Sequence, residues 1–95
     1  MKKDIKSAKQ MERHLKGVSN HWRIEIIMLI NKEEALTLEE IVEALNINEK
    51  TASEHTRRLV QAGLLNKRYL GRNVEHTLSP YGKIFANFIK TFQHS

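Results

Sequence analysis

The fold of this chain is decided by residues 48–63, which read NEKTASEHTRRLVQAG. Asn48 is a favoured helix N-cap, because its side-chain oxygen can accept a hydrogen bond from an unpaired backbone N–H of the first turn. Gly63 suits the left-handed conformation that often follows the last residue of a helix. One narrow and mostly apolar face recurs between them at helical spacing: Ala52, Thr56, Leu59 and Val60. The segment therefore predicts an amphipathic helix over residues 48–62.

The opposite face of this predicted helix is polar and carries several basic groups. It consists of Lys50, Glu54, Arg57 and Gln61, flanked by Ser53 on one side and by Thr51 and Arg58 on the other. The major groove of DNA is wide enough to admit an α-helix, so one interpretation is a DNA-recognition helix. An ordinary solvated helix face explains the same pattern. The neighbouring segments decide between the two and favour DNA.

Residues 37–47 predict another helix directly before this one. Thr37 and Glu40 have the spacing of a capping box. An apolar stripe follows at helical spacing: Leu38, Ile41, Val42 and Leu45. Only Asn46 and Ile47 then precede the cap of the next helix. Two helices joined by so short a turn share a core, and this arrangement is the helix-turn-helix unit, whose second helix is the recognition helix.

The segment after the recognition helix predicts a β-hairpin. Side chains alternate along residues 64–70 and 74–78, and Gly71-Arg72-Asn73 supplies the turn. A basic ribbon beside a recognition helix is typical of a wing, which contacts the phosphate backbone or the minor groove. Its basic residues are Lys67, Arg68 and Arg72. We therefore predict a wing over residues 64–78.

A helix is also predicted near the start of the chain, over residues 4–16. Asp4 is its expected N-cap, and Gly17 is its expected end. Its apolar stripe is thin and consists of Ala8, Met11, Leu15 and Val18. So narrow a stripe does not stabilise a helix in isolation, and we expect this one to pack on another element.

A second helix should follow, capped by Ser19 or Asn20 and ending near Asn31. Its body is apolar nearly all round, which is typical of the buried centre of a small domain. A short strand is the competing interpretation, because the segment is rich in β-branched residues. Its length and its cap favour the helix.

The last helix begins at Ser79-Pro80, a cap residue followed by proline at the first helical position. It carries one long stripe at helical spacing: Tyr81, Ile84, Phe85, Phe88, Ile89 and Phe92. This stripe either completes the core of the domain or forms a homodimer interface together with Met11 and Leu15 of the first helix. We favour the dimer, because the helix carries more apolar surface than one small core absorbs.

Composition limits the possible classes of function. The chain has 95 residues, which suits one domain, and no cysteine, which excludes disulfides and thiolate metal sites and is compatible with the cytoplasm. Its net charge of +5 favours a polyanionic partner such as nucleic acid. No apolar run approaches the roughly 18 residues of a membrane span. We expect no membrane segment and no signal peptide.

No enzyme function and no cofactor are predicted. The sequence lacks a phosphate-binding loop, a Gly-x-Ser-x-Gly motif and a carboxylate pair clustered with a histidine. The five histidines include no His-x-x-x-His pair, so no metal site is predicted within one chain. A zinc site assembled between two subunits stays open. The sequence indicates no particular small-molecule effector.

The order helix-helix-helix-helix-strand-strand-helix, taken with several motifs, resembles the ArsR family of winged-helix repressors. The matching segments are NHWRIEII at residues 20–27, LNIN at 45–48, ASEH at 52–55, AGLL at 62–65 and GRNV at 71–74. The resemblance implies one mainly α winged helix-turn-helix domain over residues 1–95, with a small β-hairpin wing. Residues 1–18 and 79–95 would be flanking dimerisation helices.

The family resemblance also implies a cytoplasmic homodimer that binds an inverted repeat in double-stranded DNA near a promoter. The implied DNA-facing residues are Lys50, Thr51, Ser53, Glu54, His55 and Arg57, with Arg72 at the wing tip; Arg58, Lys67 and Arg68 complete our predicted interface. The chain departs from the family pattern at Thr56 and His76, where leucine and tyrosine are usual. It also lacks the sensor cysteines and the Asp-x-His metal pattern of the last helix.

Three predicted interface residues have competing roles. Arg57 either grips a guanine base or contacts a phosphate, and we favour the guanine. Glu54 either accepts from a cytosine or, as we favour, pairs with a basic neighbour along the helix. His55 either donates to a phosphate or is hydrogen-bonded internally. An alternative function is a protein-interaction module within a transcription assembly, which Glu54 and the acidic residues at 39, 40 and 43 would favour.

Overall fold

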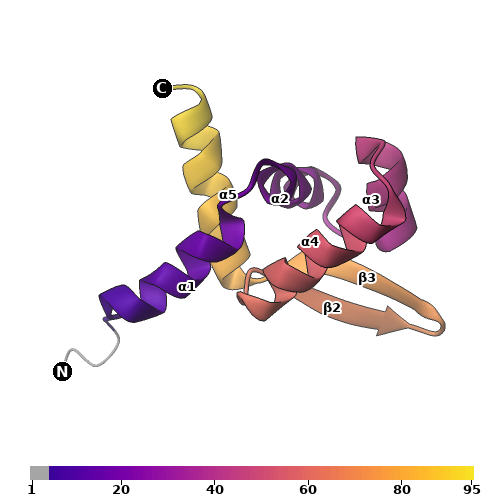
Figure 1. Cartoon of the computed structure of the whole chain (residues 1–95), viewed down its shortest axis with the longest axis horizontal. Coiled ribbons are helices and arrows are strands. Elements are labelled where there is room, and N and C mark those ends of the chain that lie inside the picture. The colour runs from indigo at the N-terminus through magenta and orange to yellow at the C-terminus, as the bar shows by residue number, and fades with distance from the viewer. Residues whose placement is uncertain (1–4) are drawn as a thin grey trace.

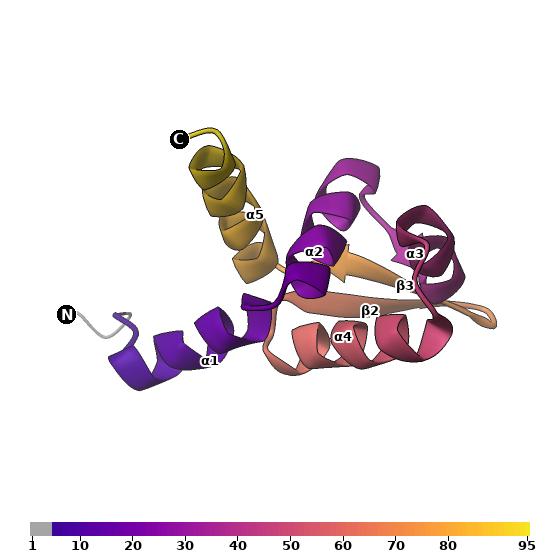
Figure 2. The same cartoon turned by 45° about the horizontal axis from the view of Figure 1, so that its top comes forward.

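A computed structural model describes residues 5–95, and these form the predicted winged helix-turn-helix with one additional strand. The elements are α1 (Ala8–Val18), α2 (His21–Glu33), β1 (Leu36–Thr37), α3 (Leu38–Leu45), α4 (Glu49–Gln61), β2 (Leu65–Leu70), β3 (Asn73–Leu78) and α5 (Pro80–Gln93). Helices α1 and α5 extend to one side of the body, and the β2–β3 wing extends to the other (Figures 1 and 2). Within the described chain, no helix is long and apolar enough to cross a membrane.

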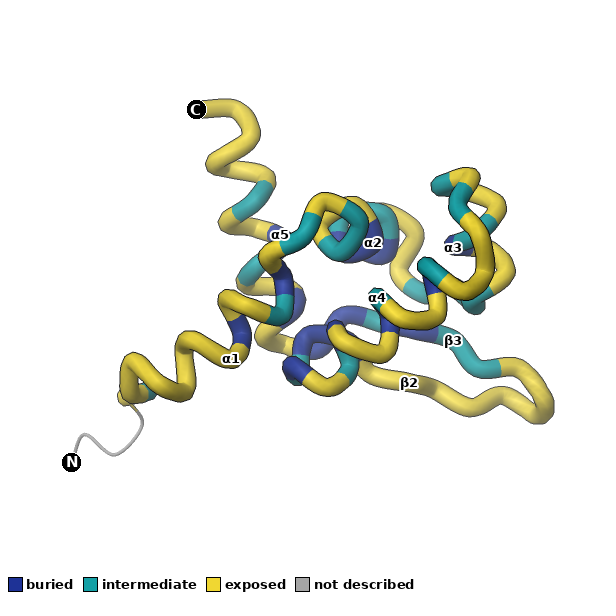
Figure 3. The backbone as a smooth tube through the Cα atoms, in the orientation of Figure 1, coloured by how far each residue is buried: buried dark blue, intermediate teal, exposed yellow. Residues whose placement is uncertain are grey.

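Helix α2 is the centre of the core, as its apolar composition predicts. Ile26, Ile27 and Ile30 are fully buried. They belong to one cluster with Leu59 of α4 and Ile41 of α3. Figure 3 shows the buried segments gathered where α2, α4, the roots of the strands and the start of α5 meet. The helix extends past the predicted end at Asn31 to Glu33.

The caps of the helix-turn-helix are the predicted ones. The Thr37 hydroxyl accepts from the Glu40 backbone N–H at 3.2 Å, and the Glu40 carboxylate accepts from the Thr37 N–H at 2.9 Å. The Asn48 side chain accepts from the Thr51 N–H at 2.7 Å. Gly63, with φ of 77°, ends α4 in the left-handed conformation. These contacts fix both ends of α4.

The sheet contains a strand that the sequence does not predict. β1 pairs antiparallel with β3, so the strand order is β1-β3-β2. Leu36 lies opposite His76, whose Nδ1–H donates to the Leu36 carbonyl at 3.3 Å. The hairpin turn is one residue shorter than predicted, because Asn73 already pairs with Leu70 across the strands.

Helix α1 differs most from its prediction. It begins at Ala8 with Ser7 as its N-cap, and the predicted cap Asp4 lies outside the described residues. Gly17 does not end the helix, which continues to Val18. A Cβ atom at Gly17 would overlap the Cβ of Ala62, so glycine here permits close contact between α1 and the end of α4. The predicted stripe is buried only at Val18, while Ala8, Met11 and Leu15 are exposed.

Contacts at its first turn set the position of α5. The Ser79 hydroxyl donates to the Gly63 carbonyl at 2.7 Å and accepts from the Gly82 N–H at 2.9 Å. A Cβ atom at Gly82 would overlap the Leu64 carbonyl oxygen. The start of α5 is therefore held directly against the residues that follow α4, and its remaining turns extend away from the body (Figure 2).

Candidate nucleic-acid interface

The solvent-facing side of α4 presents most of the predicted interface. Lys50, Ser53, Glu54, Arg57 and Arg58 are exposed, and Thr51 and His55 are half-buried. The helical spacing of these side chains divides them between two flanks. Ser53 and Arg57 lie on the flank toward the wing, whereas Thr51, His55 and Arg58 lie on the flank toward α1 and α2. The two flanks have different chemistry.

The wing-side flank borders a groove of about 340 Å³ between α4 and the hairpin. Arg57 from α4 and Lys67 and Arg72 from the wing all line it. Within residues 5–95, no hydrogen bond or ion pair holds any of these three cationic side chains. Glu39 of α3 also lines the groove, but it makes no ion pair with them in the described structure. Cations without partners along one groove can bind phosphate or the acceptor edge of a base.

Arg68 is not part of this groove. Side chains alternate between the two faces of a strand, so Arg68 lies on the face opposite Lys67. It pairs with Glu75 of the neighbouring strand at 2.6 Å. The structure therefore places Arg68 on a different face from the other basic residues of the predicted interface and gives it a carboxylate partner.

The α1-side flank is held by internal contacts. The Arg23 guanidinium of α2 donates from Nη1 to His55 Nδ1 at 3.0 Å. Of the two roles left open for His55, the structure therefore has the internal hydrogen bond. Burial, followed by the positive charge of Arg23, lowers the pKa of His55 and keeps the imidazole neutral and able to accept. Arg23 stands out in the sequence only through the family resemblance. Its partner His55 is 32 positions away in the chain, and no local pattern indicates the contact.

One further expectation for α4 is confirmed, and the polar residue at its core position is satisfied. Glu54 pairs with Arg58 at 3.5 Å, one turn along the helix, as the favoured interpretation predicts. The Thr56 hydroxyl donates to the Ala52 carbonyl at 2.9 Å, which satisfies a polar group at a core position. Glu54 thus orients Arg58, and Thr56 fits the core although leucine is usual there.

The sequence did not predict how α1 is attached to α4. His14 is buried, and its Nδ1–H donates to the Ala62 carbonyl at 2.7 Å. Arg13 Nη2 donates to the neighbouring Gln61 carbonyl at 2.5 Å. Both bonds satisfy carbonyls at the end of α4, which lack partners within the helix. A histidine among apolar positions gives no signal that distinguishes this role from an exposed one.

The histidines lie apart in the fold. His14 joins α1 to α4, His55 accepts from α2, and His76 lies under the sheet against β1. Among residues 5–95, no three histidines or carboxylates are grouped closely enough to hold a metal ion. Burial lowers the pKa of His76, and the charge of Lys67 adds to this effect.

Comparisons with known proteins agree with this geometry. The family profile described as bacterial regulatory protein, arsR family, matches residues 20–67, from the N-cap of α2 to the first half of β2. No curated protein sequence matches the chain closely enough to be compared with it. The informative relatives are therefore solved structures.

Three solved structures illustrate the similarity. HlyU from Vibrio cholerae N16961 superimposes over 100% of both chains, with a TM-score of 0.83 and 23% identity. The transcriptional repressor PagR of Bacillus anthracis has a TM-score of 0.79 and 18% identity over 85% of this chain and 93% of its own. The homodimeric winged helix-turn-helix DNA-binding domain Mb0332 from Mycobacterium bovis has a TM-score of 0.79 and 24% identity over 90% of this chain and 80% of its own.

At these identities the structural similarity shows the fold, whereas the profile shows the family. The chain belongs to the arsR family of bacterial regulatory proteins and is a transcriptional regulator with a DNA-binding winged helix.

Proposed function

We propose that this protein is a homodimeric repressor that binds an inverted repeat in double-stranded DNA in the cytoplasm. Helix α4 enters the major groove, and the wing contacts the backbone or the minor groove. The observation that carries this proposal is that Arg57, Lys67 and Arg72 line one groove and have no internal partner in the described chain. Burying or clustering cations without partners is unfavourable, and duplex DNA supplies the missing negative charge.

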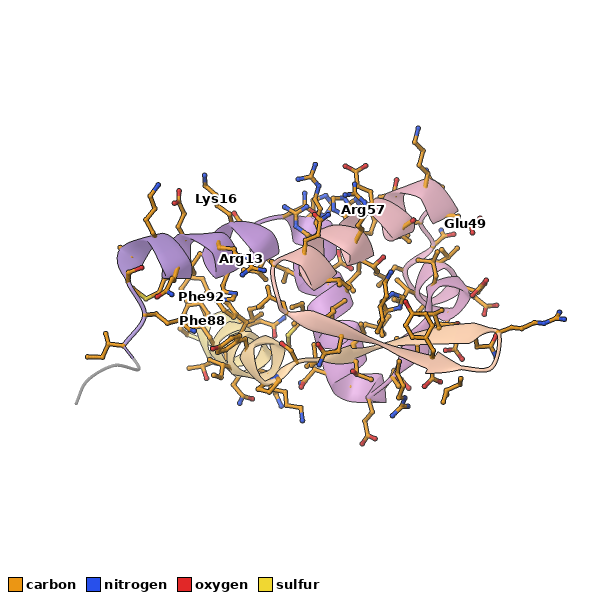
Figure 4. All side chains as sticks on the ribbon, turned by 90° about the horizontal axis from the view of Figure 1, so that it is seen from below. Arg13, Lys16, Glu49, Arg57, Phe88 and Phe92 are labelled. Carbon is orange, nitrogen blue, oxygen red and sulfur yellow. The ribbon has the colours of Figure 1, made fainter. Side chains whose placement is uncertain are left out.

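The apolar surface of α1 and α5 supports the dimer. The stripe on α5 divides into two parts, because Phe85 and Ile89 pack against the core while the rest faces solvent. The exposed part consists of Tyr81 (40% exposed), Ile84 (61%), Phe88 (58%) and Phe92 (68%). Figure 4 shows Phe88 and Phe92 on the side of α5 that is turned toward α1 in that view. The core role therefore applies to Phe85 and Ile89, and we propose the dimer role for the exposed part of the stripe.

Helix α1 continues the same apolar surface. Met11 and Leu15 are 45% and 54% exposed, and with Ile84 they line an apolar hollow of about 250 Å³ between the two helices. Large contiguous apolar patches of this kind mark interaction surfaces. A second copy of the chain is the natural occupant, because the similar Mb0332 domain is described as homodimeric. Two-fold symmetry would bury the same patch on both subunits.

A symmetric dimer determines what the DNA site looks like. Two α4 helices related by a two-fold axis read two half-sites of opposite orientation, about 34–36 Å apart when they lie one helical turn apart. The bound sequence is then an inverted repeat. The similar protein PagR is described as a transcriptional repressor, and this favours repression as the outcome of binding.

Selection of bound duplexes from a random DNA pool, combined with sedimentation of the protein, tests the proposed function. We expect a palindromic consensus and a dimer in solution. The matched variants are Phe88→Glu, which places a charge in the apolar patch, and Lys90→Glu on the opposite side of α5. The first variant should sediment as a monomer and lose high-affinity binding, and the second should remain a dimer. A monomeric wild type that selects no consensus would support the protein-interaction alternative instead.

A further inference from the structure

A second basic hollow lies at the junction of α1, α2 and α4. Its volume is about 300 Å³, and four cationic side chains from the three helices line it. They are Arg13 and Lys16 from α1, Arg23 from α2 and Arg58 from α4. The hollow lies on the α1-side flank of α4 and shares no residue with the groove beside the wing.

The positive charge in this hollow is only partly compensated. Glu12 pairs with Lys16 at 3.1 Å, and Glu54 pairs with Arg58 at 3.5 Å. Both carboxylate side chains are about half exposed, at 48% and 47%, so these pairs are weak and easily exchanged. Arg13 and Arg23 have no carboxylate partner among residues 5–95. Four cations therefore face two carboxylates, and the site is matched to an added anion.

Two of the four donors of this hollow are held in position before any ligand binds, whereas Lys16 and Arg58 have only exposed ion pairs. Arg13 is oriented by its bond to the Gln61 carbonyl, and Arg23 by its bond to His55. The buried Arg23 Nε has no hydrogen-bond partner in the described structure. The contact between Gly17 and Ala62 brings α1 directly against α4, so donors from both helices reach the same space. A site assembled in this way loses little entropy on binding.

The position of the hollow relative to α4 indicates what the anion is. Arg58 follows Lys50 by eight positions, which places the two about 12 Å apart along the helix axis. The major groove is also about 12 Å wide, so a helix segment of this length spans the distance between the two bordering backbones. Figure 4 shows Lys16 of α1 and Arg57 of α4 on the same side of the molecule. A duplex lying along α4 would meet both helices.

We propose that the junction of α1 and α4 binds a phosphate of the DNA backbone through Arg13, Lys16 and Arg58, so that α1 belongs to the DNA interface as well as to the dimer. This inference rests on the proposed recognition of duplex DNA by α4. Its role is positional, because phosphate contacts set the register of the protein on the duplex and carry no sequence information themselves.

The test measures how affinity for the selected duplex depends on salt, in Lys16→Gln and in a control, Lys83→Gln. The Lys16 side chain is 77% exposed, so its replacement leaves the fold intact. Lys83 is an exposed lysine of α5 outside the apolar stripe, and its replacement removes the same charge. We expect Lys16→Gln to reduce the slope of log affinity against log salt by about 0.9 per subunit. Its affinity should fall several-fold for every sequence alike, and Lys83→Gln should behave as the wild type.

The possible outcomes separate this inference from the proposed function. A wild type that binds its consensus, with Lys16→Gln and Lys83→Gln indistinguishable in slope, would overturn the phosphate site and leave DNA recognition intact. A wild type without duplex binding would overturn both. Titration with inorganic phosphate, followed through the backbone amide signals of Gly17 and Arg58, identifies a free anion. Phosphate binding there without any change in the DNA slope on Lys16→Gln would also contradict the proposal.

Discussion

The two flanks of α4 differ in how their basic side chains are held. On the wing side, Arg57, Lys67 and Arg72 line a groove and have no internal partner in the described chain. On the α1 side, Arg58 is paired with Glu54, and His55 accepts from Arg23. The same helix thus carries free side chains along one edge and anchored ones along the other.

This difference suggests that the two flanks have different roles in binding DNA. Free side chains can adjust to the edge of a base, although ordering them on binding costs entropy. Side chains that have internal partners are less free to search for a base, and they can contact a repeating phosphate backbone with a smaller further loss of entropy. We therefore assign sequence preference to Arg57 on the wing-side flank, and register on the duplex to the α1-side flank. The four predictions below test this assignment, from the largest expected effect to the smallest.

Replacing Gly17 by valine should displace α1 from the end of α4. The contacts of the α1-side flank are then lost, and those of the wing side stay intact. The added side chain would overlap Ala62, and overpacking of this kind costs about 1–3 kcal/mol. Urea denaturation measures the loss of stability. Ala44→Val, at an exposed position of α3, is the control and should cost no more than about 0.7 kcal/mol. Equal losses in the two variants would show that α1 is not held tightly against α4.

Replacing Arg57 by alanine should relax sequence preference. A bidentate arginine–guanine contact contributes about 1–3 kcal/mol of discrimination. The comparison is Arg72→Ala at the wing tip, which should weaken binding to all sequences alike. Competition binding with the consensus and with singly substituted duplexes measures both effects. If the two variants lost affinity equally for every duplex, base recognition would not belong to Arg57.

Two histidines, His55 on the α1-side flank of α4 and His76 under the sheet, should make stability depend on pH. The pKa of His55 and that of His76 are lowered below the usual 6.5, chiefly by burial. Between the lowered pKa and 6.5, the unfolded chain binds more protons than the folded chain, so the free energy of unfolding falls as the pH decreases through this window. Urea denaturation from pH 7 to pH 5 should show the loss, and His55→Gln should show less of it. A free energy of unfolding that rises on acidification would contradict the neutral form of His55.

The smallest effect is expected from Glu54→Gln. The pair with Arg58 is an exposed helix pair, and its removal should cost about 0.3–0.5 kcal/mol of stability. Binding to DNA should become slightly tighter at low salt, because a carboxylate is removed from the interface and Arg58 is released. Weaker binding of this variant to one particular base pair would instead indicate that Glu54 accepts from a cytosine.

Much of the fold was predictable because its signals are local. Asn48, Thr37 and Gly63 act within one helical turn of their own position, and the structure has all three in the predicted roles. The strand β1 was not predictable, because two residues carry no periodicity and their pairing partner His76 is distant in the chain. Gly17 was misassigned for the same reason, since its neighbour Ala62 comes from another helix.

The same distinction between local and distant signals applies to the candidate site. The polar face of α4 and the basic wing follow from helical and strand periodicity alone, so their residues were found in the sequence. The separation of Arg68 from Lys67 follows from strand alternation, but the ion pair with Glu75 needs the register of the hairpin. Three contacts with α4 are made between helices, by Arg23, His14 and Arg13. No pattern within one helix indicates them.

The most direct test of the two-flank account is a titration of the labelled protein with its selected duplex, followed by backbone amide shifts. The account predicts that the largest shifts form one continuous band through the second half of α1, the exposed side of α4 and the tip of the wing. Shifts concentrated on the acidic side of α3, with α4 unaffected, would contradict it.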